Sequence, residues 1–284
     1  MYETTANLIY EIIIVDNGST DGSIDMLAIE FPEIHAINNK INLGFAKANN
    51  QAIKVARGKL IMLLNSDTIV KKGAIESLAE FMKEHKSVAA VGPKVFNLDG
   101  SLQSTGHSFP SIGDVLLSLL RIPHFVLPKL RKRLFPELFR NVDDISRVGY
   151  IKGCCMMLNK HIIDKIGPLD EDFFFFAEDI EWCYRARKFG YHIYYNPYSE
   201  IVHYGGASDI DQPRQHMLNA SALLYKKCYG KMNGFIILFL TILSSLSTLV
   251  IAYVSKANIH EINMLRQKII QNFEIIYKLM VPNK

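Results

Sequence analysis

Three groups of acidic residues each follow an apolar stretch, where a carboxylate can hold a ligand or accept a proton. They are Asp16 after residues 11–15, Asp67 after residues 60–64, and Glu178 with Asp179 after the aromatic run 173–176. A single aspartate just past a strand commonly caps the next helix. The set of three is more informative, because the strand ends of a parallel sheet converge on one crevice. Carboxylates gathered there repel one another and need a cation or another ligand.

A second set of residues offers ligands for a metal ion. Asn65, Ser66 and Asp67 form a compact, oxygen-rich turn, which suits a divalent ion that keeps several waters and bridges phosphates. His203 ends another apolar stretch and can supply a nitrogen ligand, which favours manganese over magnesium. The alternative for His203 is a structural role as a hydrogen-bonded histidine.

An alternation of strands and helices positions these groups. Apolar runs predict strands at residues 11–15, 60–64, 88–91, 150–158, 192–196 and 200–203. Apolar residues at helical spacing predict helices near residues 24–31, 45–56, 75–82 and 162–166 and from residue 180, with Ser23 as the cap of the first. This order is typical of an α/β sheet whose functional loops lie at the carboxyl ends of the strands.

Composition excludes several classes of protein. The 284 residues are 49% hydrophobic, which rules out disorder and suffices for one large domain or a domain with an appendage. The net charge of +4 does not indicate a nucleic-acid binder, and we expect no nucleic-acid partner. Residues 1–10 lack a secretory signal, so we expect catalysis in the cytoplasm. The cysteines have no metal-ligand spacing and are expected to be buried and reduced: Cys154, Cys155, Cys183 and Cys228.

Several motifs, in order along the chain, resemble those of glycosyltransferase family 2. Residues 15–23 (VDNGSTDGS) resemble its nucleoside-binding signature, and residues 42–46 (NLGFA) with Asn49 and Asn50 resemble its next loop and helix. Residues 63–68 (LLNSDT) are similar to its variant of the Asp-x-Asp metal motif. The acceptor-side block of its rhamnosyltransferase-like branch is matched by residues 167–171 (GPLDE), 173–174 (FF), 178–179 (ED) and 185–187 (RAR).

The resemblance, which covers residues 11–208, implies a GT-A fold with a mixed, mostly parallel sheet flanked by helices. It also implies inverting transfer of a sugar from a nucleoside diphosphate, with Mg²⁺ or Mn²⁺ as cofactor. Asp67 and His203 would bind the metal, and Asp179 would be the general base with Glu178 as its acidic neighbour. Asp16 would bind the nucleotide base, within a nucleotide-binding set of Asp16, Asn17, Ser19, Asn42, Gly44, Asn49 and Asn65.

Two features depart from the family pattern. Asn65 stands where other members have the first aspartate of the metal motif, which weakens the charge but keeps an oxygen. Ten residues precede the strand at 11–15, whereas family members have a strand and a helix there. We therefore expect an N-terminally shortened chain with an unpaired edge at residues 12–15.

Two other functions are alternatives to a glycosyltransferase. The first is a truncated, non-catalytic relative that still binds a nucleotide or a partner. The second is a nucleotidyltransferase, which also uses strand-end carboxylates and a divalent ion. The sequence disfavours it, because the amino-terminal region has no Gly-rich, Lys-containing phosphate loop.

The C-terminal segment has the composition of a membrane-associated tail. Residues 232–255 carry no charge and are long enough to cross a bilayer. Residues 262–280 have an amphipathic pattern that can pack back on this segment, and a buried soluble hairpin is the alternative. Within the uncharged segment, a polar stripe would face a partner helix if the helix spans the bilayer, or the headgroups if it lies in the interface: Thr241, Ser244, Ser245 and Thr248.

A basic stretch earlier in the chain predicts a second contact with an anionic bilayer. It combines apolar residues with Arg121, Lys129, Arg131, Lys132 and Arg133. A solvated basic face over an ordinary loop, or a site for the phosphates of the acceptor, is the alternative.

These observations predict a glycosyltransferase domain over residues 1–230 and a membrane-associated helical tail over residues 231–284. The expected reaction is hexosyl transfer, with rhamnose as the sugar that the resembled branch implies. The expected acceptor is a saccharide or a lipid-linked saccharide in the synthesis of cell-surface polysaccharide or cell wall. We expect the protein at the cytoplasmic face of the cell membrane, with the tail either spanning the membrane or lying on its surface.

Overall fold

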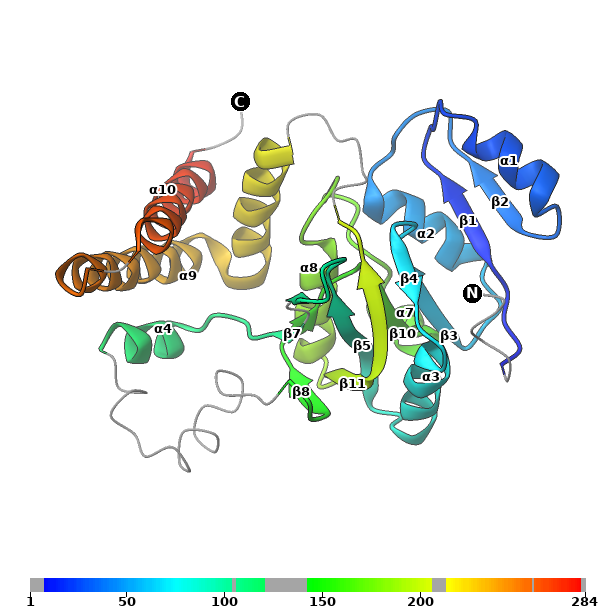
Figure 1. The fold of residues 1–284 in the computed structure, drawn as a ribbon, viewed down its shortest axis with the longest axis horizontal. Coiled ribbons are helices and arrows are strands. Elements are labelled where there is room, and N and C mark those ends of the chain that lie inside the picture. Colours follow the sequence, from blue (N-terminus) through cyan, green and yellow to red (C-terminus); the bar gives the residue numbers. More distant parts are fainter. Residues whose placement is uncertain (1–7, 104–105, 121–141, 206–212, 257, 282–284) are drawn as a thin grey trace. The chain divides into compact units, whose positions relative to one another are not determined.

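The computed structural model describes residues 8–103, 106–120, 142–205, 213–256 and 258–281. The chain forms two compact units (Figure 1). The first consists of Met1–Ser108 and Arg140–Asp211, and the second of Phe109–Phe139 and Gln212–Lys284. The basic stretch at residues 121–133 lies outside the described residues.

A seven-stranded mixed sheet forms the centre of the first unit. Its main path runs in the order β3-β10-β5-β11-β4, with β6 beside β5 and β8 beside β11. The strands are β3 (Leu60–Leu64), β4 (Thr68–Val70), β5 (Val88–Phe96), β6 (Leu102–Gln103), β8 (Ser146–Val148), β10 (Cys155–Asn159) and β11 (His192–His203).

The mixed α/β sheet is confirmed, but the expectation of a mostly parallel sheet is wrong for the described pairings. Only β5–β11 in this sheet and β1–β2 outside it are parallel, and the other pairs are antiparallel. The reason is the long excursion between β5 and β10. The chain returns to the same end of the sheet at which β5 stopped, so β10 runs against both β5 and β3.

Two further strands, β1 (Ile13–Asp16) and β2 (His35–Asn38), form a separate parallel pair. In the described part of the chain β1 pairs only with β2. Three consecutive apolar residues of β1, Ile13, Ile14 and Val15, stay partly exposed. Helix α1 (Ser23–Glu30) connects the two strands, and α2 (Phe45–Val55) packs against β1.

The main core lies between the large sheet and α3 (Ala74–Glu84). Leu78, Ala79 and Met82 of α3 are buried against strand residues that include Val91 and Met157. Helix α7 (Lys160–Ile166) follows β10, and α8 (Glu178–Lys188) packs against β11 and the short strand β9 (Tyr150–Ile151), which pairs with β7 (Gly106–His107). All four cysteines are buried and free, as predicted.

Several element boundaries differ from the prediction. Residues 150–158 form two strands, β9 and β10, because the turn at Gly153 and Cys154 interrupts them. The strands expected at 192–196 and 200–203 are one long strand, β11, with an irregularity between Asn196 and Glu200. Gly22 rather than Ser23 occupies the N-cap position of α1, and the Ser23 hydroxyl donates to Asp21 at 2.6 Å.

Helices build the described part of the second unit. They are α4 (Ile112–Leu119), α9 (Pro213–Val254) and α10 (Ile259–Met280). Gly230 has φ 75° and ψ 163° and breaks α9 into residues 213–229 and 231–254. The boundary expected at residue 230 falls at this break, whereas the second unit includes the chain from Gln212 onward together with Phe109–Phe139. By length and composition α9 is the one described helix that is able to cross a membrane.

Candidate active site

The loop after β1 wraps its backbone around one carboxylate. Asp16 is buried, and its Oδ2 accepts the backbone N–H groups of Gly18 at 3.1 Å and Ser19 at 3.0 Å. Both hydrogen bonds go to Oδ2, which leaves Oδ1 to interact with a ligand at the carboxyl end of β1.

Asn17 ties this loop to the loop before α2. Its Nδ2 donates to Asn42 Oδ1 at 2.8 Å, and its Oδ1 accepts the backbone N–H of Leu43 at 3.0 Å. Asn42 Oδ1 also accepts the N–H of Gly44 at 2.9 Å. Asp16, Asn17, Ser19, Asn42 and Gly44 are therefore brought together, and the amides of Asn17 and Asn42 are engaged in holding the two loops.

Gly44 joins the second loop to the aromatic run before α8. Its φ is 88°, and a Cβ at this position would collide with the carbonyl oxygen of Phe174. That same oxygen accepts the backbone N–H of Phe45 at 2.8 Å. Only glycine fits this contact, so the predicted donor-side and acceptor-side segments touch here.

The remaining predicted nucleotide ligands lie elsewhere. Asn49 donates its amide to Phe45 O at 2.9 Å within the first turns of α2, so that group serves the helix. Asn65 lies in the turn between β3 and β4, where its carbonyl accepts the Thr68 hydroxyl at 2.6 Å. The structure does not place the side chains of Asn49 and Asn65 in the loop cluster of Asp16 and Asn42.

The two expected metal ligands, Asp67 and His203, are neighbours. His203 Nε2 lies 3.3 Å from Asp67 Oδ1, and both side chains are largely buried. Strand pairing explains this, because β4 and β11 place Thr68 opposite His203. The backbone N–H of Tyr204 also donates to Asp67 O at 2.9 Å.

Gln103, which the sequence analysis did not single out, orients His203. His203 Nδ1 lies 3.0 Å from Gln103 Oε1, and Gln103 Nε2 donates to Asn97 Oδ1 at 3.0 Å. The bond to Asn97 fixes which way the Gln103 amide points. Its oxygen therefore faces the imidazole and can accept a hydrogen bond from Nδ1, while Nε2 faces Asp67. Gln103 precedes His203 by 100 positions, so no local sequence signal identifies the pair.

Asp67 and His203 fit a divalent ion that keeps open coordination positions. They supply one carboxylate and one imidazole whose ring is oriented by Gln103, and an outer partner of this kind is typical of metal-binding histidines. Among the described residues there is no group of three or more His, Cys, Asp or Glu side chains that can hold a metal ion. Ligands from solvent or from a diphosphate therefore have to complete the coordination shell.

Asp179 is held at the first turn of α8. Its Oδ2 accepts the N–H of Gly153 at 2.6 Å, and its Oδ1 accepts the N–H of Ile180 at 2.7 Å. Burial raises the pKa of Asp179, and these two backbone donors act against that rise. Gly153 was not predicted; a Cβ there would lie 3.3 Å from Asp179 Oδ2, so its small size permits the approach.

Glu178 is the second member of the acidic pair. Its Oε2 has no hydrogen-bond partner among the described residues. Burial, and then the neighbouring charge of Asp179, raise the pKa of Glu178 to about 8. A pKa of about 8 favours the protonated form of Glu178 at neutral pH, and the two backbone donors favour the charged form of Asp179.

Cys154 connects the metal-ligand pair with the acidic pair. Its carbonyl accepts the backbone N–H of Asn65 at 2.9 Å. Burial raises the pKa of the Cys154 thiol to about 11, and the charges of Asp179 and Asp67 both add to the rise. Both carboxylates therefore lie close to the turn between β9 and β10.

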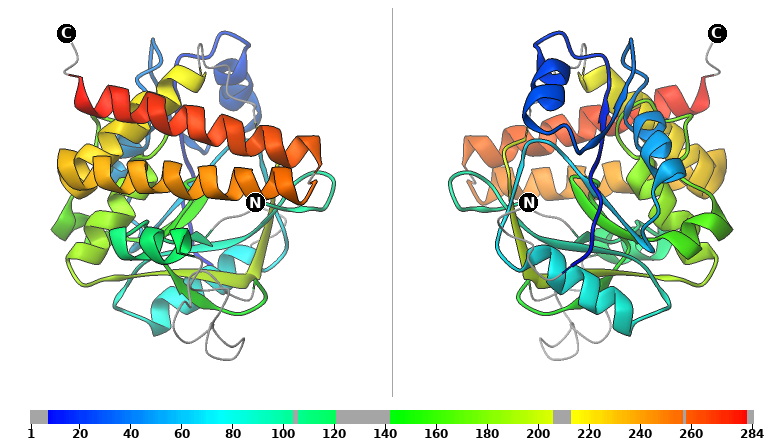
Figure 2. Two further views of the ribbon diagram at one scale, coloured as in Figure 1. Left: turned by 90° about the vertical axis from the view of Figure 1, so that its left-hand side faces the viewer. Right: turned by 90° about the vertical axis from the view of Figure 1, so that its right-hand side faces the viewer.

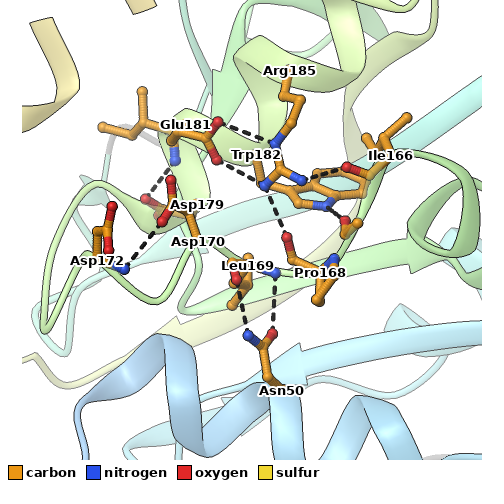
Figure 3. Close-up of polar contacts among 12 residues, drawn as sticks. Asn50, Ile166, Pro168, Leu169, Asp170, Asp172, Asp179, Glu181, Trp182 and Arg185 are labelled. Carbon is orange, nitrogen blue, oxygen red and sulfur yellow. Dashed lines mark hydrogen bonds and ion pairs between the residues drawn. The ribbon is translucent and has the colours of Figure 1, made fainter. Parts of the chain in front are cut away.

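Strain and a network of buried polar groups hold α8 in place. Phe176 and Ala177, directly before the helix, have φ values of 71° and 72°, which is uncommon for residues other than glycine. Within α8, Arg185 contacts both carboxylate oxygens of Glu181 and donates to the carbonyl oxygens of Ile166 and Pro168 (Figure 3). Trp182 donates its indole N–H to Gly167 O at 2.9 Å.

The same segment is fixed to α2. The amide of Asn50 exchanges two hydrogen bonds with the backbone of Leu169, at 2.9 and 3.1 Å (Figure 3). It also donates to Glu171 at 2.9 Å. The predicted acceptor-side block therefore acts largely as a scaffold. Arg185 and Asn50 anchor the loop that leads to Glu178 and Asp179.

Comparison with known proteins identifies relatives over most of the chain. A family model described as "Glycosyl transferase family 2" matches residues 3–167. The N-acetylglucosaminyl-diphospho-decaprenol L-rhamnosyltransferase of Mycobacterium tuberculosis is 24% identical over 222 residues, which cover 72% of this chain and 70% of the relative. The low-salt glycan biosynthesis hexosyltransferase Agl10 of Haloferax volcanii is 28% identical over 189 residues, 63% of this chain and 53% of the relative.

Two solved structures share the fold. The mannosyltransferase PcManGT from Pyrobaculum calidifontis, in complex with GDP-Man and Mn²⁺, has a TM-score of 0.54 at 12% identity and covers 94% of this chain and 76% of its own. GalNAc-T7 with UDP, GalNAc and Mn²⁺ has a TM-score of 0.53 at 13% identity and covers 76% of this chain and 41% of its own. At these identities the likeness concerns the fold alone.

Proposed function

The chain belongs to glycosyltransferase family 2, with a rhamnosyltransferase-like sequence and a GT-A fold, and we propose that it transfers a sugar with inversion from a nucleoside diphosphate to a saccharide acceptor. The observation that carries this proposal is the convergence of two carboxylates on one turn. Asp67 is paired with His203 on one side of Cys154, and Asp179 is held by Gly153 on the other.

In the proposed mechanism Asp179 is the general base. It carries the negative charge of the acidic pair, and it accepts the proton of the acceptor hydroxyl as that oxygen attacks the anomeric carbon of the donor. Glu178, which is protonated at neutral pH, adds no second charge beside the base. Inversion follows from this single displacement, because the hydroxyl attacks on the face opposite the departing diphosphate.

Asp67 and His203 would hold a divalent ion, as the Mn²⁺ in the two structural relatives supports. When bound, Mg²⁺ or Mn²⁺ supplies positive charge that stabilises the leaving diphosphate. Asp16 would interact with the nucleotide base through its free oxygen, and Ser19 would lie beside it. Asn17, Asn42 and Gly44 would shape the nucleotide-binding loops, and Asn49 and Asn65 would support them from α2 and from the metal turn.

The mycobacterial relative favours a rhamnosyl donor and a lipid-linked acceptor. Its name describes transfer of L-rhamnose to a diphospho-decaprenol carrying N-acetylglucosamine. We propose the same substrate classes for this chain, in cell-surface polysaccharide or cell-wall synthesis at the cytoplasmic face of the membrane. In this proposal residues 1–230 catalyse the transfer and residues 231–284 associate with the membrane.

Kinetics and binding of two variants test this function. Asp67→Ala is expected to abolish the Mn²⁺-dependent binding of dTDP or UDP in calorimetry. Asp179→Asn is expected to leave nucleotide binding nearly intact and to lower transfer about 10²- to 10⁴-fold, because a base acts on the acceptor. Unchanged metal-dependent affinity in Asp67→Ala would contradict the metal assignment. Nucleotide binding by the wild-type protein without any transfer would favour the non-catalytic alternative.

A further inference from the structure

The second half of α9 is apolar but not a core helix. Residues 232–254 carry no charge, and only 28% of the most hydrophobic 18-residue stretch of α9 is buried. The helix is covered on one side by α10, which runs antiparallel beside it (Figure 2). Much of the apolar surface of α9 therefore faces outward and needs an environment other than water.

The register of α10 against α9 argues against a membrane-spanning position. Leu279 packs against Gly234, and Arg266 hydrogen-bonds the hydroxyl of Tyr253. Ile275 packs in one cluster with Leu238, so the neighbouring Glu274 lies level with the uncharged segment of α9, inside its first half. Both carboxylate oxygens of Glu274 accept hydrogen bonds from Nη2 of Arg214, whose side chain is 66% exposed. A spanning α9 would place this exposed ion pair in the hydrocarbon core, which is strongly unfavourable.

Five of the exposed apolar residues of α9 form a stripe. Phe239, Leu243, Leu246, Val250 and Tyr253 are all exposed and follow a spacing of three and four residues. At 3.6 residues per turn they fall within an arc of about 80°. The polar stripe centred on the buried Ser245 lies on the other side of the helix, where Thr241 and Thr248 donate their hydroxyls to backbone carbonyls of the same helix.

Helix α10 adds a parallel stripe on the same side of the hairpin. On α10, Ile276 packs against the core cluster that α9 and α10 share. The exposed residues of the stripe lie about 100° further around the helix, counted from the N-terminus to the C-terminus: Ile270, Phe273 and Tyr277. On α9, Leu238 belongs to the same core cluster, and the α9 stripe also lies about 100° further around the helix from it in the N-to-C direction. Equal rotations on antiparallel helices point in one direction, so the two stripes form one continuous surface, which we call the hairpin face.

The charge balance of the helices that carry the hairpin face favours an anionic partner. Residues 213–281 carry eight Lys and Arg side chains and two glutamates, Glu261 and Glu274. Two tyrosines, Tyr253 and Tyr277, lie on the hairpin face, and tyrosine is enriched at the boundary between hydrocarbon and headgroups. A flat apolar stripe with aromatic residues and basic surroundings is the pattern of a helix that lies in a membrane interface.

We infer, building on the proposed association with the membrane, that the hairpin face inserts into one leaflet of an anionic bilayer with α9 and α10 lying in the membrane plane. The chain is then held on one side of the membrane and does not cross it. Burial of the two stripes supplies the apolar contribution, and the basic side chains around them contact the lipid phosphates.

Flotation of the full-length protein with vesicles of phosphatidylcholine and phosphatidylglycerol tests the surface. Replacing Leu243, Val250 and Phe273 together by Gln is expected to lower the partition coefficient at least about tenfold, because three exposed apolar groups lose their lipid contact. The matched control replaces three exposed apolar residues of the first unit by Gln and is expected to float like the wild type: Ile29, Leu98 and Phe189. Equal flotation of both triple variants would overturn the assignment of the hairpin face.

The orientation of α9 is tested by the accessibility of single cysteines to a labelling reagent in sealed, inverted membrane vesicles from cells that express the protein. The four native cysteines are buried, so single variants Lys231→Cys and Ser255→Cys report the two ends of the uncharged segment. A membrane-impermeant maleimide is expected to label both ends from the cytoplasmic side. Labelling of one end only would show a spanning helix and overturn the inference.

Two further measurements complete the test. Sedimentation of the protein without lipid is expected to show a monomer, and a dimer that the hairpin-face triple variant separates would assign the surface to a second copy of the chain instead. Sugar transfer to a short soluble acceptor is expected to be equal in both triple variants. Absence of transfer by the wild-type protein, with both ends still labelled from the cytoplasmic side, would refute the proposed function and leave the inference about the hairpin face intact.

Discussion

At the residue scale, a side chain from a different strand orients the imidazole of His203. Gln103 lies on β6, which pairs with β5, while His203 ends β11 on the other edge of β5. The hydrogen bond between them directs Nε2 toward Asp67. Asn97 in turn accepts a hydrogen bond from the amide of Gln103, so two side chains orient the ring of one ligand.

We therefore expect Gln103→Ala to weaken the Mn²⁺-dependent binding of a nucleoside diphosphate about 10- to 100-fold, because the imidazole loses its outer partner. Gln103→Glu keeps an acceptor for Nδ1 and is expected to retain most of the affinity. Calorimetric titration of Mn²⁺ in the presence of dTDP measures the affinity of both variants, and nucleotide binding without metal is the control. Equal metal affinity in Gln103→Ala and the wild type would refute the positioning role.

The raised pKa of Glu178 predicts a pH dependence of stability. Its folded pKa of about 8 lies above the ordinary 4.5, so the folded state holds a proton that the unfolded state releases between these values. Stability is therefore lost as the pH rises through this window, by up to about 1.4 kcal/mol per pH unit. Glu178→Gln removes the titrating group, so its free energy of unfolding relative to wild type should increase from pH 5 to pH 8.

Urea denaturation at pH 5, 6.5 and 8 measures this difference. The matched control is Glu30→Gln, at an exposed position of α1, for which we expect no such trend. A constant difference between Glu178→Gln and the wild type would mean that the Glu178 carboxyl is charged in the folded protein at all three pH values.

At the scale of elements, Gly44 couples the start of α2 to the aromatic run before α8. Two kinds of constraint act on it, a positive φ and the close approach of Phe174 O. Gly73, at the start of α3, has a φ of 79°, but a Cβ added there would meet no atom within 4 Å. The two glycines therefore separate the cost of backbone strain from the cost of a collision.

We expect Gly73→Ala to destabilise the fold by about 1–2 kcal/mol through backbone strain alone. Gly44→Ala is expected to destabilise it clearly more, because the carbonyl of Phe174 has to move, and to weaken nucleotide binding as well. Chemical denaturation and calorimetry check the pair. Equal losses of stability in the two variants would show that the contact with Phe174 is loose.

At the scale of the whole molecule, the boundary between the two units decides where the chain can be divided. The first half of α9 belongs to the second unit, where Leu218 and Ala222 pack against Leu238 and Ile275. Ending the chain at residue 230 removes Leu238 and Ile275 and leaves Leu218 and Ala222 exposed. A cut at residue 211 removes both sides of this core together.

We expect a chain ending at residue 211 to stay soluble and to bind a nucleoside diphosphate with Mn²⁺. A chain ending at residue 230 should aggregate, because apolar side chains of α9 lose their partners. Size-exclusion chromatography and calorimetry compare the two. A monodisperse chain of 230 residues would instead support the boundary predicted from composition.

Local patterns in the sequence determined the family, the fold class and the principal acidic groups. Residues 15–23, 63–68 and 178–179 are contiguous motifs, and the runs at 60–64 and 45–55 predicted their strand and helix closely, because hydrophobic periodicity reports burial directly. The roles of these residues stay predictions, since their chemistry depends on ligands and on the pKa of groups in contact.

Only the tertiary structure decided the direction of the strands and the partners of the site residues. The excursion between β5 and β10 reverses β10, which no local pattern encodes. Gln103 reaches His203 across 100 positions, and Gly153 reaches Asp179 across 26. In the same way the register of α10 sets the Arg214–Glu274 ion pair beside an uncharged helix that composition alone allows to span a bilayer. Side-chain periodicity specifies which face of an element is buried, whereas the partner on that face is chosen by long-range packing.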